Sequence, residues 1–155
     1  MPNINISIRN LTVSDLPSLF EHQLDPEATA MAAFPSRDKE AFNAHWAKVM
    51  ANESNITRTI EVDGQVAGYL GSWEMEGKRE VGYWLGREFW GKGIATEALK
   101  QFLGVVKTRP LWAHVAKQNL GSKRVLEKCG FKVIGDDKYV NIGKQEVEEF
   151  VLKLD

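Results

Sequence analysis

Residues 83–96 read YWLGREFWGKGIAT, and this stretch decides the fold. An apolar strand pattern ends, the chain turns through Gly91 and Gly93, and an amphipathic helical pattern begins at Ile94. The first amides of a helix lack intrahelical acceptors, and the helix dipole places partial positive charge there. Glycines let the backbone approach a ligand closely, and Lys92 adds a positive charge. The turn therefore predicts a site for a phosphate or diphosphate. The alternative is a tight strand-to-helix turn that binds nothing.

Two other phosphate motifs do not fit this turn. A dinucleotide fingerprint needs a third glycine where Thr96 stands, and a Walker loop needs Ser or Thr directly after Lys92.

The residues before this stretch predict one strand, two helices and a strand meander. The first strand carries Ile4, Ile6 and Ile8, and Thr12 or Ser14 caps a short helix with Leu16, Leu19 and Phe20. Residues 25–35 are interpreted as a loop. Ser36 is the expected N-cap of a second helix, with Asp38 and Glu40 in its first turn and Phe42, Trp46, Val49 and Met50 at helical spacing. The meander strands are expected to carry Ile56, Ile60 and Val62, then residues 66–73, then residues 80–85, with turns at Asp63-Gly64 and Glu76-Gly77.

The residues after it alternate helices and strands. They predict a helix from Ile94 that ends before Pro110, a strand over 111–115, a helix over 120–129 stopped by Gly130, and a hairpin of residues 131–134 and 146–154. The order is β-α-α-β-β-β-α-β-α-β-β. We expect an α+β fold with a mixed, mostly antiparallel sheet and a single domain over residues 1–155.

Composition narrows the functional class. A net charge of −1 argues against nucleic-acid binding, and Cys129 is the one cysteine, so neither a disulfide nor a ladder of metal-spaced Cys and His is expected. The N-terminus lacks the apolar region of a signal peptide, and no stretch approaches the ~20 apolar residues that cross a bilayer. We expect a cytoplasmic protein with no metal and no membrane partner. A homodimer is the default expectation for a soluble protein.

Two segments together resemble the GNAT acyltransferases. The first is the turn Trp90-Gly91-Lys92-Gly93-Ile94-Ala95, where Trp90 replaces the Gln or Arg of the family motif. The second is residues 119–131, NLGSKRVLEKCGF, which resembles the Asn-x-x-Ser…Leu-Glu-Lys-x-Gly-Phe run of the family. The sequence of these two segments is most similar to the branch of the family that acetylates the N-terminal alanine of ribosomal proteins.

The resemblance implies acetyl-CoA as cosubstrate and an amine as acceptor. The strand ending at Leu85 would splay away from the strand over 111–115, and the pantetheine arm would pair with the backbone of Tyr83, Trp84 and Leu85. The diphosphate would lie on the turn. The implied cofactor-binding residues are Tyr83, Trp84, Leu85, Gly91, Lys92, Gly93, Ile94, Ala95, Thr96 and Asn119.

The amine must lose a proton before it attacks, because alkylammonium groups have pKa values near ~10. His114 lies where relatives often place a general-base Glu, and an imidazole with a pKa near ~6.5 suits that role. Glu80 lies close to the catalytic Glu of other branches. The alternatives are a structural histidine, an exposed carboxylate, a water relay, or no dedicated base.

The departing thiolate poses a second question. Many members protonate it with a Tyr seven residues after the motif Asn, but this chain has Leu126 there. Ser122 is the expected substitute and Tyr139, in a loop-like stretch, a weaker one. The thiolate can also leave without help, since its pKa is near ~8.5. Asn119 is expected to cap its helix, to contact pantetheine, or both.

The acceptor side would be formed by the first two helices and their loop. Trp84 and Phe34 are the expected lining residues, and Glu21, Asp25 and Glu27 are candidates to attract a cationic amine. Two other functions stay open: a non-catalytic acetyl-CoA sensor, and an unrelated α+β interaction domain.

Overall fold

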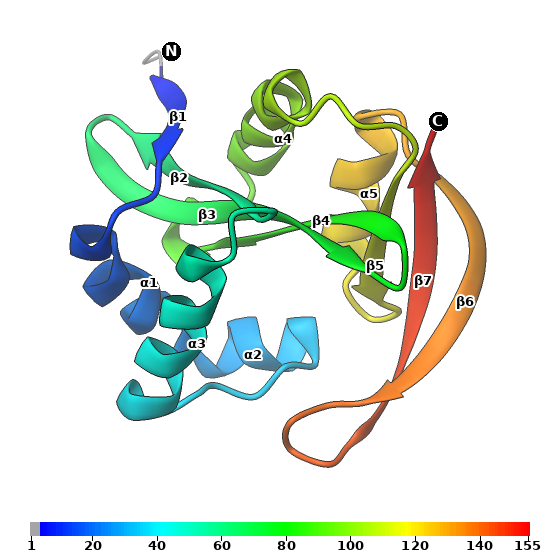
Figure 1. Cartoon of the computed structure of the whole chain (residues 1–155), viewed down its shortest axis with the longest axis horizontal. Coiled ribbons are helices and arrows are strands. Elements are labelled where there is room, and N and C mark those ends of the chain that lie inside the picture. Colours follow the sequence, from blue (N-terminus) through cyan, green and yellow to red (C-terminus); the bar gives the residue numbers. More distant parts are fainter. Residues whose placement is uncertain (1–3) are drawn as a thin grey trace.

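The computed structural model describes residues 4–155, which form seven strands and five α-helices (Figure 1). The strands are β1 (Ile6–Asn10), β2 (Ile56–Val62), β3 (Gln65–Met75), β4 (Lys78–Leu85), β5 (Leu111–Ala116), β6 (Lys132–Val140) and β7 (Glu146–Leu154). The helices are α1 (Leu16–Gln23), α2 (Pro26–Ala32), α3 (Lys39–Ala51), α4 (Ile94–Val105) and α5 (Leu120–Lys128), with 3-10 turns at Val13–Asp15 and Arg87–Phe89.

One mixed sheet organises these elements. Its strand order is β1-β2-β3-β4-β5-β7-β6, and every neighbouring pair is antiparallel except β4 and β5. The parallel pair is the one that a helix, α4, connects, as a parallel crossover requires. The predicted α+β class and mostly antiparallel sheet are confirmed.

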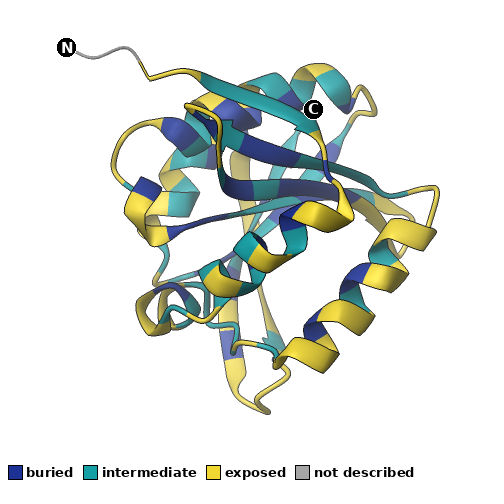
Figure 2. Cartoon of the chain, turned by 90° about the vertical axis from the view of Figure 1, so that its left-hand side faces the viewer, coloured by how far each residue is buried: buried dark blue, intermediate teal, exposed yellow. Residues whose placement is uncertain are grey.

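Helices cover both faces of the sheet, and each face has its own core (Figure 1). The apolar stripe of α4, which includes Leu99 and Phe102, packs with α5 against the sheet in the larger core. On the opposite face, α1 and α3 bury Leu19, Phe42 and Trp46 against β3. Figure 2 shows the same division, because each helix turns its buried residues inward and its exposed residues outward.

The segment expected to be a loop at residues 25–35 contains a helix, so this prediction is wrong. Asp25 caps α2 by accepting bonds from the amides of Glu27 and Ala28, and Pro26 occupies the first helical position. Proline fits there because that amide has no helical acceptor in any case. Three helices, not two, therefore separate β1 from β2.

Two other expected boundaries move, whereas the expected end of α4 before Pro110 is confirmed. Asp38, not Ser36, caps α3, and its carboxylate accepts the amide of Ala41 at 2.8 Å. Helix α4 ends at Val105, well before Pro110. Strand β6 runs to Val140, so Tyr139 lies in a strand and not in a loop, because pairing with β7 extends along the whole segment.

Candidate active site

Strands β4 and β5 touch at one point and then part. Their only paired position within residues 4–155 is Glu80 with Trp112, although β4 continues to Leu85 and β5 to Ala116. Each strand is fully paired on its other side, β4 with β3 and β5 with β7. Beyond Glu80, the edge of β4 that faces β5 and the edge of β5 that faces β4 thus have no strand partner. Their backbone N–H and C=O groups are left to bind an extended ligand.

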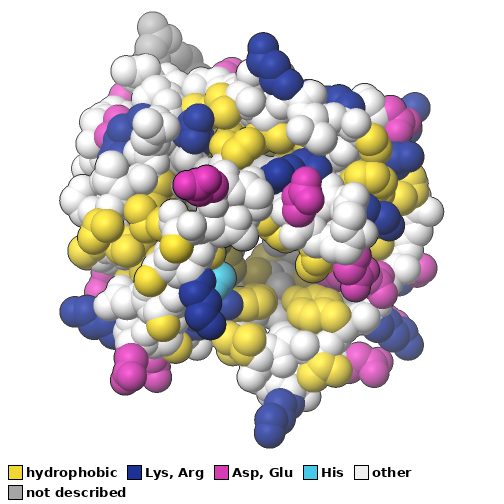
Figure 3. All heavy atoms as spheres, viewed as in Figure 1, with side chains coloured by type: hydrophobic (Ala, Val, Ile, Leu, Met, Phe, Trp, Pro, Cys, Tyr) yellow, Lys and Arg dark blue, Asp and Glu magenta, His cyan; other side chains and the backbone are white. Residues whose placement is uncertain are grey.

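A cleft of about 530 Å³ lies at this split. Its walls come from the end of β4, the turn before α4, the first turns of α5 and one side of α2. Among its lining residues are nine of the ten expected cofactor contacts: Tyr83, Trp84, Leu85, Gly91, Gly93, Ile94, Ala95, Thr96 and Asn119. The face in Figure 3 is hollowed near its centre, and hydrophobic side chains line that opening.

The glycine turn is open toward this cleft. Gly91 and Gly93 have φ values of +74° and +75°, in the left-handed region, and a Cβ added to either would have no atom within 4 Å. Helix α4 starts directly after Gly93, so the amides of its first turn lack helical acceptors. An anion therefore has both room and donors at this place.

Trp90 ties the turn to the end of β4. Its indole N–H donates to the carbonyl oxygen of Leu85 at 2.9 Å. This bond gives a structural role to the residue that departs from the family motif. It also occupies the Leu85 carbonyl. The Trp84 carbonyl faces β3, so Tyr83 is the residue of this strand end whose carbonyl faces the gap and is not taken by Trp90.

A partly buried pair of hydroxyl groups joins β4 to α5. The Tyr83 hydroxyl donates to Ser122 Oγ at 2.9 Å, and burial raises the pKa of Tyr83 to about 12, against the opposing effect of that bond. Ser122 also donates its amide to the capping side chain of Asn119, which confirms the expected cap of α5. Leu126, where relatives have a tyrosine, is buried in the core.

His114 lies between two carboxylates where the strands part. Its Nδ1 donates to Glu149 Oε1 on β7 at 2.9 Å, and its Nε2 is 3.0 Å from Glu80 Oε1 on β4. The hydrogen bond to Glu149 and the short contact with Glu80, in that order, raise the pKa of His114 to about 10, although burial opposes them. The ring is therefore a cation at neutral pH, and the expectation that it titrates near ~6.5 is wrong.

Glu80 is the less exposed of the two expected bases, and neither it nor His114 is among the residues that line the cleft. The Glu80 side chain is 2% exposed, and its Oε1 has no hydrogen-bond donor in good geometry despite the short contact with His114. A carboxylate oxygen without a donor can accept a proton, whereas an imidazolium cannot. Of the two candidates, Glu80 therefore has an acceptor atom, whereas the His114 ring has none in its charged form.

An acetyltransferase (GNAT) domain matches residues 5–132 of this sequence. The chain belongs to the GNAT acetyltransferase family. Family membership confirms the resemblance carried by residues 90–95 and 119–131.

Two curated relatives support the family. YdaF of Bacillus subtilis, whose name describes a candidate ribosomal N-acetyltransferase, is 28% identical over 113 residues, or 66% of this chain and 62% of that protein. The uncharacterised N-acetyltransferase p20 of Bacillus licheniformis is 28% identical over 144 residues, covering 84% of this chain and 80% of its own. The chain thus matches less than two thirds of the B. subtilis protein.

Solved structures share the fold. An N-acetyltransferase from Staphylococcus aureus Mu50 superposes with a TM-score of 0.81 at 21% identity, covering 97% of this chain and 98% of that one. The aminoglycoside acetyltransferase AAC(6')-Ib, solved with coenzyme A, gives 0.73 at 20% identity, covering 95% of this chain and 94% of its own. The GNAT fold is confirmed by these likenesses.

Several expected site residues lie elsewhere. Lys92 is exposed at the turn and does not line the cleft. Asp25 and Glu27 pair with Arg87 at 2.7 and 2.9 Å, so they are committed to holding α2 against the segment after β4. Phe34 lines a second cavity of about 680 Å³ between α2 and the end of the β6–β7 hairpin, apart from Trp84.

Sequence reasoning missed four side chains of this region. Arg124 and Lys128 line the cleft from one face of α5, and their four-residue spacing was an available signal. Glu149 reaches His114 from β7, and the Tyr83 hydroxyl reaches Ser122. The last two contacts join residues that are 35 and 39 positions apart in the sequence, and no local sequence pattern predicts contacts over such separations.

Among residues 4–155, no helix is both long and apolar enough to cross a membrane.

Proposed function

We propose that this chain transfers the acetyl group of acetyl-CoA to a primary amine by direct attack of the amine on the thioester. The single observation that carries the proposal is the parting of β4 and β5 after Glu80, beside an open glycine turn. Family membership supports the reaction class, and the geometry supports the roles of individual residues.

Binding begins at the diphosphate. The amides at the start of α4 offer donors, while Arg124 and Lys128 on α5 supply positive charge along the same cleft. The pantetheine arm then lies along the unpaired edge of β4 beyond Glu80. A backbone N–H at that edge polarises the thioester carbonyl, and fixed donors of this kind lower the barrier because they need no reorganisation.

Glu80 removes the proton from the ammonium form of the acceptor, directly or through a water. His114 is a positioning residue in this proposal, since its ring is held between Glu80 and Glu149 and carries the positive charge that stabilises both carboxylates. The neutral amine forms the new C–N bond, the C–S bond to coenzyme A breaks so that the thiolate leaves, and the nitrogen loses its second proton to solvent as the amide forms.

The Tyr83 hydroxyl supports the departing thiolate. With a pKa of about 12 it stays protonated, and it donates a hydrogen bond toward the sulfur through or beside Ser122. A thiol with a pKa near ~8.5 is more acidic than this phenol, so stabilisation by a hydrogen bond is favoured over full proton transfer.

The proposal is tested by following coenzyme A release with an acceptor panel. The panel contains polyamines, amino acids and N-terminal peptides of ribosomal proteins, the last because of the name of the B. subtilis relative. Turnover on one class identifies the acceptor. Saturable binding of acetyl-CoA without turnover on any amine would contradict the proposal and identify a sensor instead.

Glu80→Gln tests the base. The change keeps the side-chain shape, so we expect kcat to fall about 100-fold or more while acetyl-CoA affinity stays the same. Glu148→Gln, at an exposed neighbour of Glu149, is the control and should keep full activity. An unchanged pH–rate profile in Glu80→Gln would place the base elsewhere.

Tyr83→Phe tests the donor to the thiolate. Only the hydroxyl is lost, and we expect kcat to fall about 10- to 100-fold with little change in acetyl-CoA binding. Ser122→Ala separates the two partners of the pair, because it keeps the phenol and removes the hydroxyl that accepts from it. Equal kcat in wild type and Tyr83→Phe would refute this role.

A further inference from the structure

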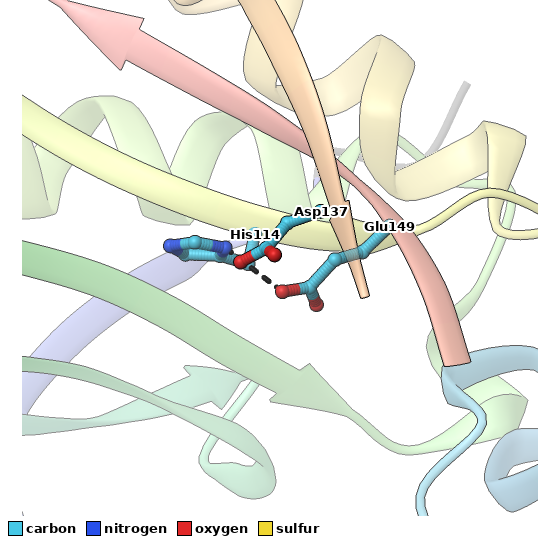
Figure 4. A group of neighbouring side chains, drawn as sticks. All are labelled: His114, Asp137 and Glu149. Carbon is cyan, nitrogen blue, oxygen red and sulfur yellow. Dashed lines mark hydrogen bonds and ion pairs between the residues drawn. The ribbon is translucent and has the colours of Figure 1, made fainter. Parts of the chain in front are cut away.

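Three strands bring a histidine and two acidic side chains together at one point of the sheet (Figure 4). His114 comes from β5, Glu149 from β7 and Asp137 from β6. Each offers one ligand atom, and these atoms lie within 4.8 Å of one another. Asp137 is opposite Glu149 in the strand register, and Glu149 is diagonal to His114, so the pleat turns all three toward the same face.

A fourth side chain completes the arrangement from the other ring nitrogen. Glu80 is 2% exposed, its Oε1 has no good hydrogen-bond donor, and that oxygen lies 3.0 Å from His114 Nε2. A histidine that binds a metal through one nitrogen almost always gives its other N–H to a carboxylate or carbonyl, which fixes the ring and strengthens the ligand. Glu80 is placed for that outer role.

The side chains around His114 carry an excess of negative charge. Three carboxylates, those of Glu80, Asp137 and Glu149, surround one imidazole, and no lysine or arginine forms an ion pair with any of them within the described chain. Neighbouring cations are engaged elsewhere: Lys117 pairs with Asp136 and Lys138 lies near Glu146 and Glu148. Among residues 4–155, the Lys138 amide donates to one Asp137 oxygen, and no protein group donates to the other.

We propose that His114 Nδ1, Asp137 and Glu149 form a binding site for a divalent transition-metal ion, with zinc as the best match, and that Glu80 orients the imidazole from behind. Zinc binding displaces the proton from His114 Nδ1 to solvent, because a metal-bound imidazole nitrogen carries no proton. One nitrogen and two carboxylate oxygens suit zinc, which binds such atoms at about 2.0–2.2 Å in tetrahedral geometry with water in a remaining position. Ligand atoms in that geometry are about 3.3 Å apart, so a small side-chain rotation from the 2.9 Å contact of His114 and Glu149 admits the ion.

A metal at this site would act on acetyl transfer as an inhibitor. It would hold Glu149 and His114, the side chains that position Glu80, at the end of the gap between β4 and β5. The site itself needs neither acetyl-CoA nor an acceptor, so its existence does not depend on the proposed function.

The test is zinc binding by the chelator-treated full chain, measured by titration calorimetry with zinc alone. Cobalt in place of zinc gives a second readout, because visible absorption reports a nitrogen- and oxygen-bound tetrahedral ion. We expect one zinc per chain for the wild type, and binding more than about tenfold weaker in Asp137→Asn, since even changes outside the ligand shell cost that much.

Asp136→Asn is the matched control. It removes the same charge one residue away, from the opposite face of β6, where Asp136 pairs with Lys117. The control should bind zinc like the wild type, and metal-free Asp137→Asn should acetylate at the wild-type rate, because Asp137 has no part in the proposed reaction.

Three results would overturn the site. They are no saturable zinc binding by the wild type, equal affinities of Asp137→Asn and the wild type, and an equal loss in the two asparagine variants. Absence of acetyl transfer by the metal-free wild type, in a protein that still binds zinc, would contradict the proposed function alone.

Discussion

At the scale of single residues, Asp15 holds the N-terminal part of the chain to the sheet. This carboxylate is 4% exposed and receives two bonds from Arg9, at 2.7 and 2.9 Å. It also accepts from the Thr59 hydroxyl at 2.8 Å and from the amide of Thr12 at 2.9 Å. One buried side chain therefore ties β1 and β2 to the first turn before α1.

Asp15→Asn should lower the free energy of unfolding by about 2–3 kcal/mol at pH 7, because it leaves the guanidinium of Arg9 without its buried partner. Chemical denaturation of both proteins measures this difference. The bonds from Arg9 are the main cause that holds the pKa of Asp15 well below its ordinary range.

A lowered pKa means that the stabilisation is present above about pH 4 and is lost as the pH falls below it. The difference between wild type and Asp15→Asn should accordingly shrink in acid. Glu53→Gln, at an exposed residue, should show no such trend. A difference that stays constant from pH 7 to pH 2 would contradict this assignment.

At the scale of elements, α2 shows how a local signal can be misjudged. Its residues are small and turn-prone, which suggested a loop. Asp25, Pro26 and Glu27 are nevertheless typical of the N-terminus of a helix. The helix is short and gains its stability from tertiary contacts, including the bond from the Asn141 amide to the Ala33 carbonyl at its end. Propensity alone was too weak to reveal it.

The turn before α4 is the element on which cofactor binding depends. Gly93→Val should weaken acetyl-CoA binding at least tenfold, because a branched side chain would enter the open space at the diphosphate site. The residue also has φ at +75°, where a side chain adds roughly 1–2 kcal/mol of strain. Equilibrium binding of acetyl-CoA measures the loss.

Gly104→Ala is the control for this change within the same helix. A Cβ at Gly104 meets no atom within 4 Å, and its φ is not in the left-handed region. We expect unchanged affinity and a stability gain of up to about 1 kcal/mol from better helix propensity. Equal acetyl-CoA affinity in Gly93→Val and Gly104→Ala would contradict binding of the diphosphate at this turn.

At the scale of the whole molecule, the site exists because two halves of the sheet separate. The half formed by β1–β4 and the half formed by β5, β7 and β6 are joined through one paired position, and the cleft lies in the resulting gap. A ligand that pairs with both edges would complete the sheet and couple the two halves.

Acetyl-CoA should for this reason stabilise the chain as a whole. At 100 times its dissociation constant it adds about 2.7 kcal/mol to the free energy of unfolding, which corresponds to a rise in Tm of roughly 5–10 °C. Thermal unfolding followed by circular dichroism checks this. Pantetheine, which lacks the diphosphate, should give a much smaller rise, and an absent response to acetyl-CoA would contradict the assigned site.

The sequence by itself determined the features whose signals are local: the hairpin turns, the helix after Gly93, the Asn119 cap and a group of residues that line the cleft. These follow from periodicity and capping, which neighbouring residues settle among themselves. Only the tertiary structure decided which side chains meet across strands. Glu80, His114, Asp137 and Glu149 lie on four strands, and their encounter depends on strand order and register. That order is set by long-range pairing and by burial of both cores, so the pKa of His114 could not be read from its own neighbours along the chain.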